Sequence, residues 1–418
     1  MSGGPAAAGD TFDVAFARAQ FPAVTDEWAL FDNAGGTPPL RGVIERVTEY
    51  MNRWQVQHGA TYAISAHATE LAAAGHRAAE RLVNAEPGEV VIGASTTMNV
   101  RVLARALRPR FRPGDEIVVT NLDHESNIGA WRELEADGVV VREWRFDPLT
   151  LELTLAGLEP LLTPRTRLVC FTHCSNVVGT LHDAAAIVRR VHAAGALACI
   201  DGVAFAPHRR VDVKAIDADF YLVSLYKVFG PHLALLYGRR ELLLESKGQN
   251  HDFIPEHDVP YKLEPGNVVH ELAASLPAIV EYLLALDARH TPGGTGDAEP
   301  ARIARAFDTL AAHEAAIAAP LLEFLRTRRG VRVLGHADAA IPHRAPTIAF
   351  TIAGRDASEI PPRLDAERIA IRYGDFYARR AIDALGLRDR GGVVRVSMAH
   401  YNTAAEVARL IAALERVV

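Results

Sequence analysis

The stretch FYLVSLYKVFGPHLALLYG, Phe220–Gly238, places one lysine between two apolar runs. Continuous apolar runs of this length are typical of strands that are buried on both faces of a parallel sheet. Lys227 is ordinarily explained as a strand-end residue whose stem lies on apolar surface while its ammonium group reaches water. The alternative is a poorly solvated amine at the carboxyl end of a parallel strand, where open α/β sheets bind ligands, that reacts as a nucleophile. The residues around Lys227 decide between these two interpretations.

Short β-rich runs alternate with helical patterns from about residue 68 to residue 238. Alternation of this kind predicts crossover units and a mostly parallel sheet with helices on both faces. The runs are EVVIGAS (89–95), DEIVVTNLDH (115–124), VVVREWRF (139–146), RLVCFTHCSN (167–176), LACIDGVAF (197–205), FYLVSLYK (220–227) and HLALLYG (232–238).

A different pattern follows the segment HTPGGTGDAEP at 290–300. A long amphipathic helix is expected over 303–328, followed by the strands PTIAFTI (346–352), IAIRYGD (369–375) and VVRVSMA (393–399). The last helix is expected to start at Thr403, because Glu406 three residues later completes a capping box. We therefore expect an N-terminal arm over 1–30 that packs on a small domain, a large α/β domain over 31–288, and that smaller α+β domain over 289–418.

Composition excludes several classes of function for this 418-residue chain. The net charge of −6, without a long basic or acidic run, gives no sign of a nucleic-acid partner. The N-terminus lacks the pattern of a signal peptide, and no apolar run is long enough to span a membrane. The three cysteines, Cys170, Cys174 and Cys199, lie in apolar strand-like runs, as buried reduced thiols do. We expect a cytoplasmic protein with no membrane partner and no metal at its site.

Further polar residues are expected at the same edge of the sheet as Lys227. Asp201 ends the strand before Lys227; it is either a capping residue or the carboxylate that keeps a pyridine nitrogen protonated. Ser95 lies where a strand meets a helix, which is either a plain N-cap or an anion site. Ser224 supplies a second hydroxyl. Asp201 and Lys227 together fit a site for pyridoxal phosphate.

For each of three more residues, an ordinary structural role stands beside a functional one. His124 follows a strand, where most histidines are hydrogen-bonded surface residues, but it could also stack on a ring and transfer protons. Asn176 ends another strand and could donate to a ring oxygen. Arg395 is ordinarily a surface ion pair, but its guanidinium suits a bidentate grip on a carboxylate.

With these residues in order, the chain resembles the class V aminotransferase group of fold-type I pyridoxal phosphate enzymes, and most closely cysteine desulfurase-like proteins. The resemblance extends from FDNAGGTPP at 31 to HYNTAAEV at 400 through GAST, DHESNIGAW, HCSNVVGT, DGVAF, SLYK, EPGN and VRVSMAHYNT. It implies a fold-type I architecture, with a mostly parallel seven-stranded sheet. Members of the family are homodimers with sites at the interface.

The resemblance also implies a role for each matching residue. Lys227 would bind the cofactor covalently, Asp201 would pair with its ring nitrogen, and His124 would stack on the ring. The other implied contacts are Ala94, Ser95, Ser224 and Tyr226 near the phosphate, Gly266 and Asn267 at the neighbouring chain's phosphate, Asn176 at the ring hydroxyl, and Asn33, Arg372, Tyr377 and Arg395 at the substrate.

The chain departs from the family pattern at three positions. Ala204 replaces the usual glutamine three residues after the aspartate, and Tyr226 replaces the usual histidine before the lysine. Tyr377, in IRYGDFYARR, stands where desulfurases of this type carry the cysteine that takes sulfur from the substrate. A phenol cannot hold sulfur as a thiolate does, so ordinary desulfurase chemistry is not expected.

The expected function is that of a pyridoxal phosphate enzyme acting on a small amino acid, with β-elimination of a thiol or sulfinate as the leading reaction. Transamination and epimerisation are the first alternatives, because they share the same carbanion and differ in where a proton goes. A non-catalytic scaffold that keeps the fold is the third. Retention of Lys227, Asp201, His124 and Arg395 together argues against the scaffold.

Overall fold

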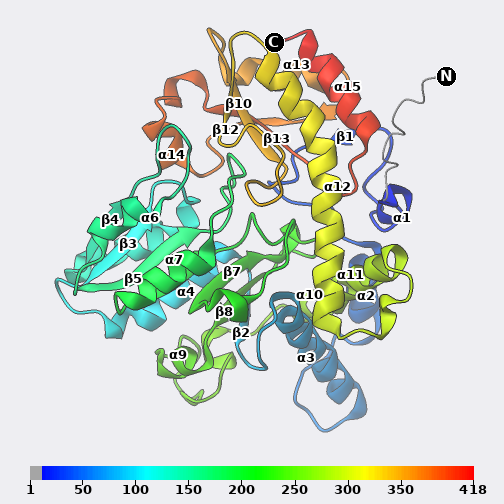
Figure 1. The fold of residues 1–418 in the computed structure, drawn as a ribbon. Coiled ribbons are helices and arrows are strands. Elements are labelled where there is room, and N and C mark those ends of the chain that lie inside the picture. The colour runs from blue at the N-terminus through cyan, green and yellow to red at the C-terminus, as the bar shows by residue number, and fades with distance from the viewer. Residues whose placement is uncertain (1–11) are drawn as a thin grey trace.

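A computed structural model describes residues 12–418 of the chain, and Figure 1 shows its course. Residues 1–11, the first part of the arm expected over 1–30, lie outside the described residues. Within residues 12–418, no helix is both long and apolar enough to cross a bilayer.

The large sheet has seven strands among the described residues, in the order β2-β8-β7-β6-β5-β3-β4. Strand β8 is antiparallel to both of its neighbours, and the other neighbouring pairs are parallel. The mostly parallel seven-stranded sheet expected from the sequence is thus confirmed. Its strands are β2 (Val90–Gly93), β3 (Glu116–Thr120), β4 (Val140–Trp144), β5 (Thr166–Thr172), β6 (Leu197–Asp201), β7 (Phe220–Ser224) and β8 (Ala234–Gly238).

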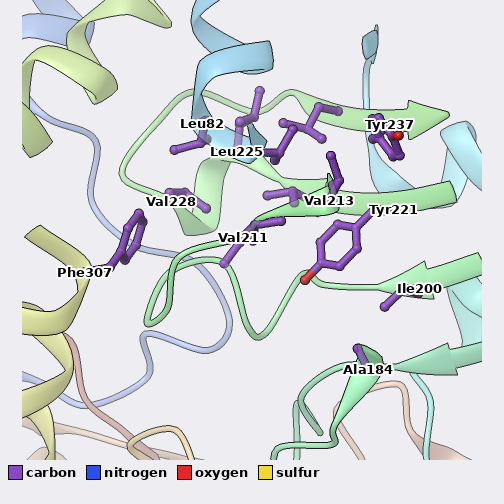
Figure 2. Close-up of a cluster of buried hydrophobic side chains, with 14 of the residues drawn as sticks. Leu82, Ala184, Ile200, Val211, Val213, Tyr221, Leu225, Val228, Tyr237 and Phe307 are labelled. Carbon is purple, nitrogen blue, oxygen red and sulfur yellow. The ribbon is translucent and has the colours of Figure 1, made fainter. Parts of the chain in front are cut away.

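Both faces of this sheet are buried, which explains the continuous apolar runs. Alternate residues of a strand point to opposite faces, so Tyr221 and Val223 of β7 join one buried cluster while Phe220 and Leu222 join another. Figure 2 shows part of the first cluster. Helices α3 (Ala63–Val83), α7 (Ala184–Ala193) and α11 (Pro277–His290) contribute to that cluster, and α4 (Thr96–Leu107) and α5 (Gly129–Arg132) contribute to the second.

A second, four-stranded sheet lies beyond the large one, in the order β12-β13-β10-β9, and all its pairs are antiparallel. Its apolar face packs against the C-terminal part of α12 (Glu299–Thr327) and against α15 (Ala404–Glu415) in a third buried cluster. The capping box expected at Thr403 and Glu406 is present at the start of α15. The strands are β9 (Val331–Leu334), β10 (Thr347–Ile352), β12 (Arg372–Gly374) and β13 (Val393–Ser397).

Helix α12 connects the two sheets, as its long course in Figure 1 shows. Ile303 and Leu310 in its first half belong to the cluster of the large sheet, whereas Leu321 and Leu325 in its second half belong to that of the small sheet. The domain boundary expected at 288/289 stays a prediction. The remaining helices are α1 (Val14–Arg18), α2 (Arg41–Arg53), α6 (Leu155–Leu158), α8 (Val213–Ile216), α9 (Arg240–Glu245), α10 (His270–Ala273), α13 (Pro361–Asp365) and α14 (Arg379–Ala384).

The run IAIRYGD, expected as one strand, is two strands in different sheets. Its first part, β11 (Ile369–Ala370), pairs in parallel with β1 (Ala29–Leu30), whereas its second part is β12. The N-terminal strand β1 therefore pairs with residues 369–370, which a continuous strand over 369–375 would have placed beside β13. The result places Asp32, just after β1, beside Ser397 of β13.

Candidate active site

One pocket lies at the carboxyl ends of β5, β6 and β7 and at the start of α4. Polar side chains that end these strands line it because parallel strands present their carboxyl ends at the same edge of a sheet. It brings together seven of the residues expected from the sequence. Its lining residues are Ser95, Thr96, Thr97, His124, Ser126, Thr172, Cys174, Asn176, Asp201, Val203, Ala204, Ser224, Tyr226 and Lys227.

Lys227 is a buried amine in this pocket. It ends a short 3-10 turn, Leu225–Lys227, that directly follows β7, and only 7% of the residue is exposed. Burial and the nearby Arg395 lower the pKa of Lys227 to about 8, although Asp201 and Asp32 act in the opposite direction. Its amine makes no hydrogen bond or ion pair within residues 12–418. A neutral, nucleophilic amine is therefore accessible near neutral pH.

Asp201 is the last residue of β6 and is also buried. Its carboxylate accepts a hydrogen bond from the Val203 N–H at 2.9 Å. Burial raises the pKa of Asp201, while that hydrogen bond and Lys227 lower it. A second carboxylate, Asp123, was not expected at the site from the sequence: burial and the nearby Asp201 raise its pKa to about 7. A positive group that entered the pocket beside Asp201 would stabilise its ionised form.

Hydroxyl groups meet where α4 begins. The Ser95 side chain caps α4 by accepting from the Met98 N–H at 3.2 Å. The Thr96 and Ser224 hydroxyls lie 2.7 Å apart and are buried. Thr96 has no sequence signal of its own, and its contact with Ser224 at the end of β7 gives it a place in the site. A helix N-terminus with three hydroxyls around it is suited to bind a phosphate.

His124 lines the same pocket after β3. Its Nδ1 accepts from the Ser126 N–H at 3.1 Å, so the proton of the neutral ring is assigned to Nε2. Burial, Lys227 and Arg395 lower the pKa of His124 to about 4. The His124 ring is thus uncharged near pH 7, which suits stacking on another ring better than supplying a positive charge.

Arg395 on β13 approaches the pocket through Asn176. Its Nη1 donates to the Asn176 carbonyl at 3.0 Å, and its Nη2 donates to Asp32 Oδ1 at 2.9 Å. The guanidinium carbon lies 3.7 Å from the centre of the Phe376 ring. Burial lowers the pKa of Arg395 to about 10, against the effect of Asp32, and the buried Nε has no hydrogen-bond partner in the described chain.

Asp32 joins the two arginines expected at the substrate, and sequence analysis missed it. Its other oxygen lies 3.4 Å from Nη1 of the exposed Arg372. Tyr377 is 71% exposed, has a left-handed backbone (φ 60°), and its ring lies 5.3 Å from that of His124. The loop that carries Tyr377 thus reaches the edge of the pocket, although neither Arg372 nor Tyr377 lines it.

Four expected site residues lie elsewhere in the chain. Ala94 and Asn267 line a neighbouring pocket beside α4. Gly266 is exposed, and the Asn267 side chain accepts from the Tyr261 hydroxyl at 3.1 Å. Asn33 is buried, with its amide donating to the Leu30 and Ser397 carbonyls. The roles assigned to these four residues stay predictions.

Of the three cysteines, Cys174 lines the pocket. It is 1% exposed, and burial raises the pKa of its thiol to about 12. The other two, Cys170 and Cys199, are paired in register inside the sheet and are completely buried. A thiol with this pKa stays protonated near neutral pH and is a poor nucleophile.

Comparison with known proteins identifies the family. Residues 29–289 and 302–410 match the family described as aminotransferase class-V. The chain belongs to the class V aminotransferases. It is 38% identical to the aminotransferase-like protein FGM3 of Gibberella zeae, over 97% of this chain and 99% of FGM3. It is 34% identical to the cysteine desulfurase-like protein ustD of Aspergillus flavus, over 98% of this chain and 91% of ustD.

The same relationship is seen in three dimensions. The class V chain superimposes on the crystal structure of the cysteine desulfurase CsdA from Escherichia coli with a TM-score of 0.81 and 27% identity, over 97% of this chain and 98% of CsdA. Family membership makes the protein a pyridoxal phosphate-dependent enzyme with the fold-type I architecture expected from its sequence.

The pocket of this class V enzyme fits that cofactor by the chemistry of its groups. Lys227 offers a buried amine without a hydrogen bond or ion pair in the described chain, and Asp201 offers a buried carboxylate one strand away. The start of α4, with Ser95, Thr96 and Ser224, offers donors for a phosphate. Lys227 would bind the cofactor covalently, Asp201 would pair with its ring nitrogen, and the hydroxyls at the start of α4 would bind its phosphate.

Proposed function

We propose that this class V enzyme is a β-elimination lyase that cleaves the bond between carbon and sulfur in a small amino acid without a persulfide cysteine. The observation that carries the proposal is the absence of a reactive thiol at the site. Tyr377 occupies the loop position of the family's sulfur acceptor, and the one thiol lining the described pocket, Cys174, is held protonated by burial. The sulfur atom is therefore released within the departing β-substituent and is not transferred to a thiol of the enzyme.

Pyridoxal phosphate, when bound, supplies an electron sink that stabilises negative charge on the substrate's α-carbon. Asp201 would keep the ring nitrogen protonated, because a buried carboxylate is stabilised by a cation beside it. Lys227, whose pKa is about 8, would take the α-proton at pH values near neutrality and pass a proton to the departing sulfur group. The neutral His124 ring would pack on the cofactor and exclude water from that face.

Arg395 would hold the carboxylate of the substrate. Its guanidinium group already donates one hydrogen bond to Asn176 and one to Asp32, and its Nε has no hydrogen-bond partner in the described chain. Phe376 packs on the guanidinium plane and limits its rotation. These contacts preorganise the group for a single carboxylate.

The relatives support the chemistry at the level of the family. CsdA and ustD are named for cysteine desulfurase or likeness to it, so cysteine-type substrates with a β-sulfur group are the natural class to test. The elimination releases a thiol or sulfinate and an unsaturated amino acid, and one water molecule then hydrolyses that amino acid to a keto acid and ammonia.

Transamination is the second candidate, with epimerisation sharing its observation. The Tyr377 ring is 71% exposed and lies 5.3 Å from that of His124, so aromatic surface is available for a bulkier side chain than that of cysteine. FGM3 is named as aminotransferase-like. A non-catalytic scaffold has no such support, since the Lys227 and Asp201 pair is intact and the chain belongs to an enzyme family.

The deciding experiment adds cysteine, cysteine sulfinate and a panel of other amino acids to the holoenzyme without any keto acid. Repeated turnover to keto acid and ammonia, with the cofactor unchanged in its absorbance, is the result expected of a lyase. Lys227→Ala is the control and should be inactive. One equivalent of keto acid with conversion of the cofactor to its pyridoxamine form would contradict the proposal and establish a transaminase. Racemised amino acid would establish an epimerase.

We propose further that the working enzyme is a homodimer in the cytoplasm, in which Gly266 and Asn267 reach the phosphate of the neighbouring chain. Neither residue lines the Lys227 pocket of its own chain, which is the arrangement that such sharing requires. Light scattering gives the assembly state. Asn267→Ala should weaken cofactor binding in the dimer; an unchanged affinity for the cofactor would remove Asn267 from the site.

A further inference from the structure

A separate cavity of about 260 Å³ lies in the small C-terminal sheet region. It is formed where β9, β10 and β13 meet the segment before α13. Ile352, Ile360 and Val394 give it an apolar floor, and three arginines, Arg332, Arg355 and Arg390, also line it. No residue lines both this cavity and the Lys227 pocket.

The three arginines lack partners. Within residues 12–418, none of the guanidinium groups of Arg332, Arg355 and Arg390 makes a hydrogen bond or an ion pair. One nitrogen, Nη1 of Arg355, is buried as well as unpaired. A buried guanidinium N–H without an acceptor carries a desolvation cost, which an anion in the cavity would remove.

The one carboxylate in the lining, that of Asp356, is hydrogen-bonded to the neighbouring Ser358 and not to the arginines. Asp356 accepts hydrogen bonds from the N–H and the hydroxyl of Ser358, each through Oδ1, and it forms a capping box with Glu359. It therefore leaves the arginines without a bonded counter-charge. Three positive groups against one negative group give the cavity an excess of positive charge that favours an anion.

The cavity lies at one end of the small sheet, where Gly330, Ala353 and Gly392 adjoin the strands, and residues from both faces of the sheet line it. Val394 and Arg395 are neighbours on β13, and neighbouring residues of a strand point to opposite faces. Arg395 faces the Lys227 pocket through Asn176, whereas Val394 belongs to the buried cluster of the small sheet. Arg332 pairs with Thr351 on the face that carries Arg395, but neither Arg395 nor any residue of the Lys227 pocket lines the cavity. A molecule in the cavity would therefore be a second ligand and not the amino-acid substrate.

We propose that this cavity binds a small organic anion, with a carboxylate or phosphate group on the three arginines and an apolar body on the floor. Both halves of that description come from the lining: free guanidinium groups pair with planar or tetrahedral oxyanions, and an aliphatic floor has no donor for a second polar group. Inorganic phosphate alone would leave the floor exposed to water.

Phenyl phosphate is the probe, titrated calorimetrically into the holoenzyme, whose own phosphate site is filled by its cofactor. One molecule per chain is expected to bind, and inorganic phosphate and phenol, the two halves of the probe, should each bind more weakly. Arg355→Gln and Arg390→Gln should each weaken phenyl phosphate binding about tenfold or more, as loss of a charge-assisted hydrogen bond does.

Arg363→Gln is the matched control, because Arg363 is an exposed arginine of α13 that does not line the cavity. It should leave the affinity unchanged, and circular dichroism confirms that each variant is folded. Absence of binding to the holoenzyme, or binding that Arg355→Gln and Arg390→Gln leave intact, would overturn the proposal. Equal affinity for inorganic phosphate and phenyl phosphate would show a plain anion site and contradict the role of the apolar floor.

Discussion

Lys227 owes its reactivity to where the chain places it, and not to an unusual partner. Burial is the largest cause of its lowered pKa, and the opposing charges of Arg395 and Asp201 partly cancel. At pH 7 an amine with a pKa near 8 is neutral in roughly a tenth of the molecules, against roughly four in ten thousand for a lysine in water. Burial at the end of β7 thus makes the Lys227 amine nucleophilic before any cofactor binds.

The pH dependence of cofactor uptake tests this pKa. Only the neutral amine attacks the aldehyde of pyridoxal phosphate, so the rate at which the apoprotein takes up cofactor should rise with pH through a midpoint near 8. Stopped-flow absorbance measures the rate. A midpoint above 10 would show that Lys227 is as well solvated as a free lysine. Lys227→Ala, which has no amine, should show no covalent uptake and serves as the control.

Arg395→Lys tests the forked geometry at the substrate. A lysine keeps the charge but has one nitrogen in place of the planar set of nitrogens that reaches Asn176, Asp32 and a substrate carboxylate. We expect KM for the amino acid to rise about tenfold to a hundredfold, with a smaller change in kcat. Arg363→Lys is the control, because Arg363 is an exposed arginine of α13 that does not line the pocket. Equal effects of the two variants would contradict the assignment of Arg395.

Residues that end strands could be predicted from the sequence, whereas residues defined by contacts could not. Lys227, Asp201 and Ser95 follow from periodicity and from the common edge of a parallel sheet. Asp32 is 363 residues from Arg395 along the chain, and its role depends on how β1 pairs with β11. Thr96 and Asp123 likewise have a place in the site only through neighbours on other strands.

At the scale of elements, helix α4 has two separable functions at its N-terminus. Ser95 caps the helix, and its hydroxyl also faces the pocket where we place the phosphate. Ser95→Ala should remove both functions, lowering the stability of the apoprotein by about 1 kcal/mol and weakening cofactor binding. Ser95→Gly should weaken cofactor binding as much but cost only a few tenths of a kcal/mol, because glycine is a good N-cap.

Thermal unfolding of the apoprotein and cofactor titration of both variants measure these two effects. If Ser95→Gly bound the cofactor as tightly as the wild type, the hydroxyl would be only a helix cap. The comparison works because the residue at the N-cap is exchanged while the backbone amides of α4 stay in place.

Short β-rich runs that alternate with helical patterns predicted most strands, but they could not predict pairing. The sequence run at 232–238 was expected as a strand, and only the structure shows that β8 is antiparallel to its neighbours. The split of IAIRYGD into β11 and β12 was missed because both halves have the same apolar character. Strand β9 was missed for a related reason: it is a short edge strand with only Leu334 fully buried.

At the scale of the whole molecule, α12 ties the two sheets into one structure. Its first half is buried against the large sheet and its second half against the small one, without a break in the helix. Arg395 comes from the small sheet and Lys227 from the large one, so the site needs both in fixed positions. A continuous helix that is buried at both ends supplies that fixed relation.

This arrangement predicts how the apoprotein unfolds. Leu310 and Leu321 are both completely buried in α12, the first against the large sheet and the second against the small one. Replacing either with alanine should cost about 2–5 kcal/mol. Because the helix is shared, we expect each variant to lower the midpoint of a single unfolding transition, measured by calorimetry and by circular dichroism. Two transitions, with Leu310→Ala moving one and Leu321→Ala moving the other, would show instead that the halves of α12 melt separately and that the two sheets are independent units.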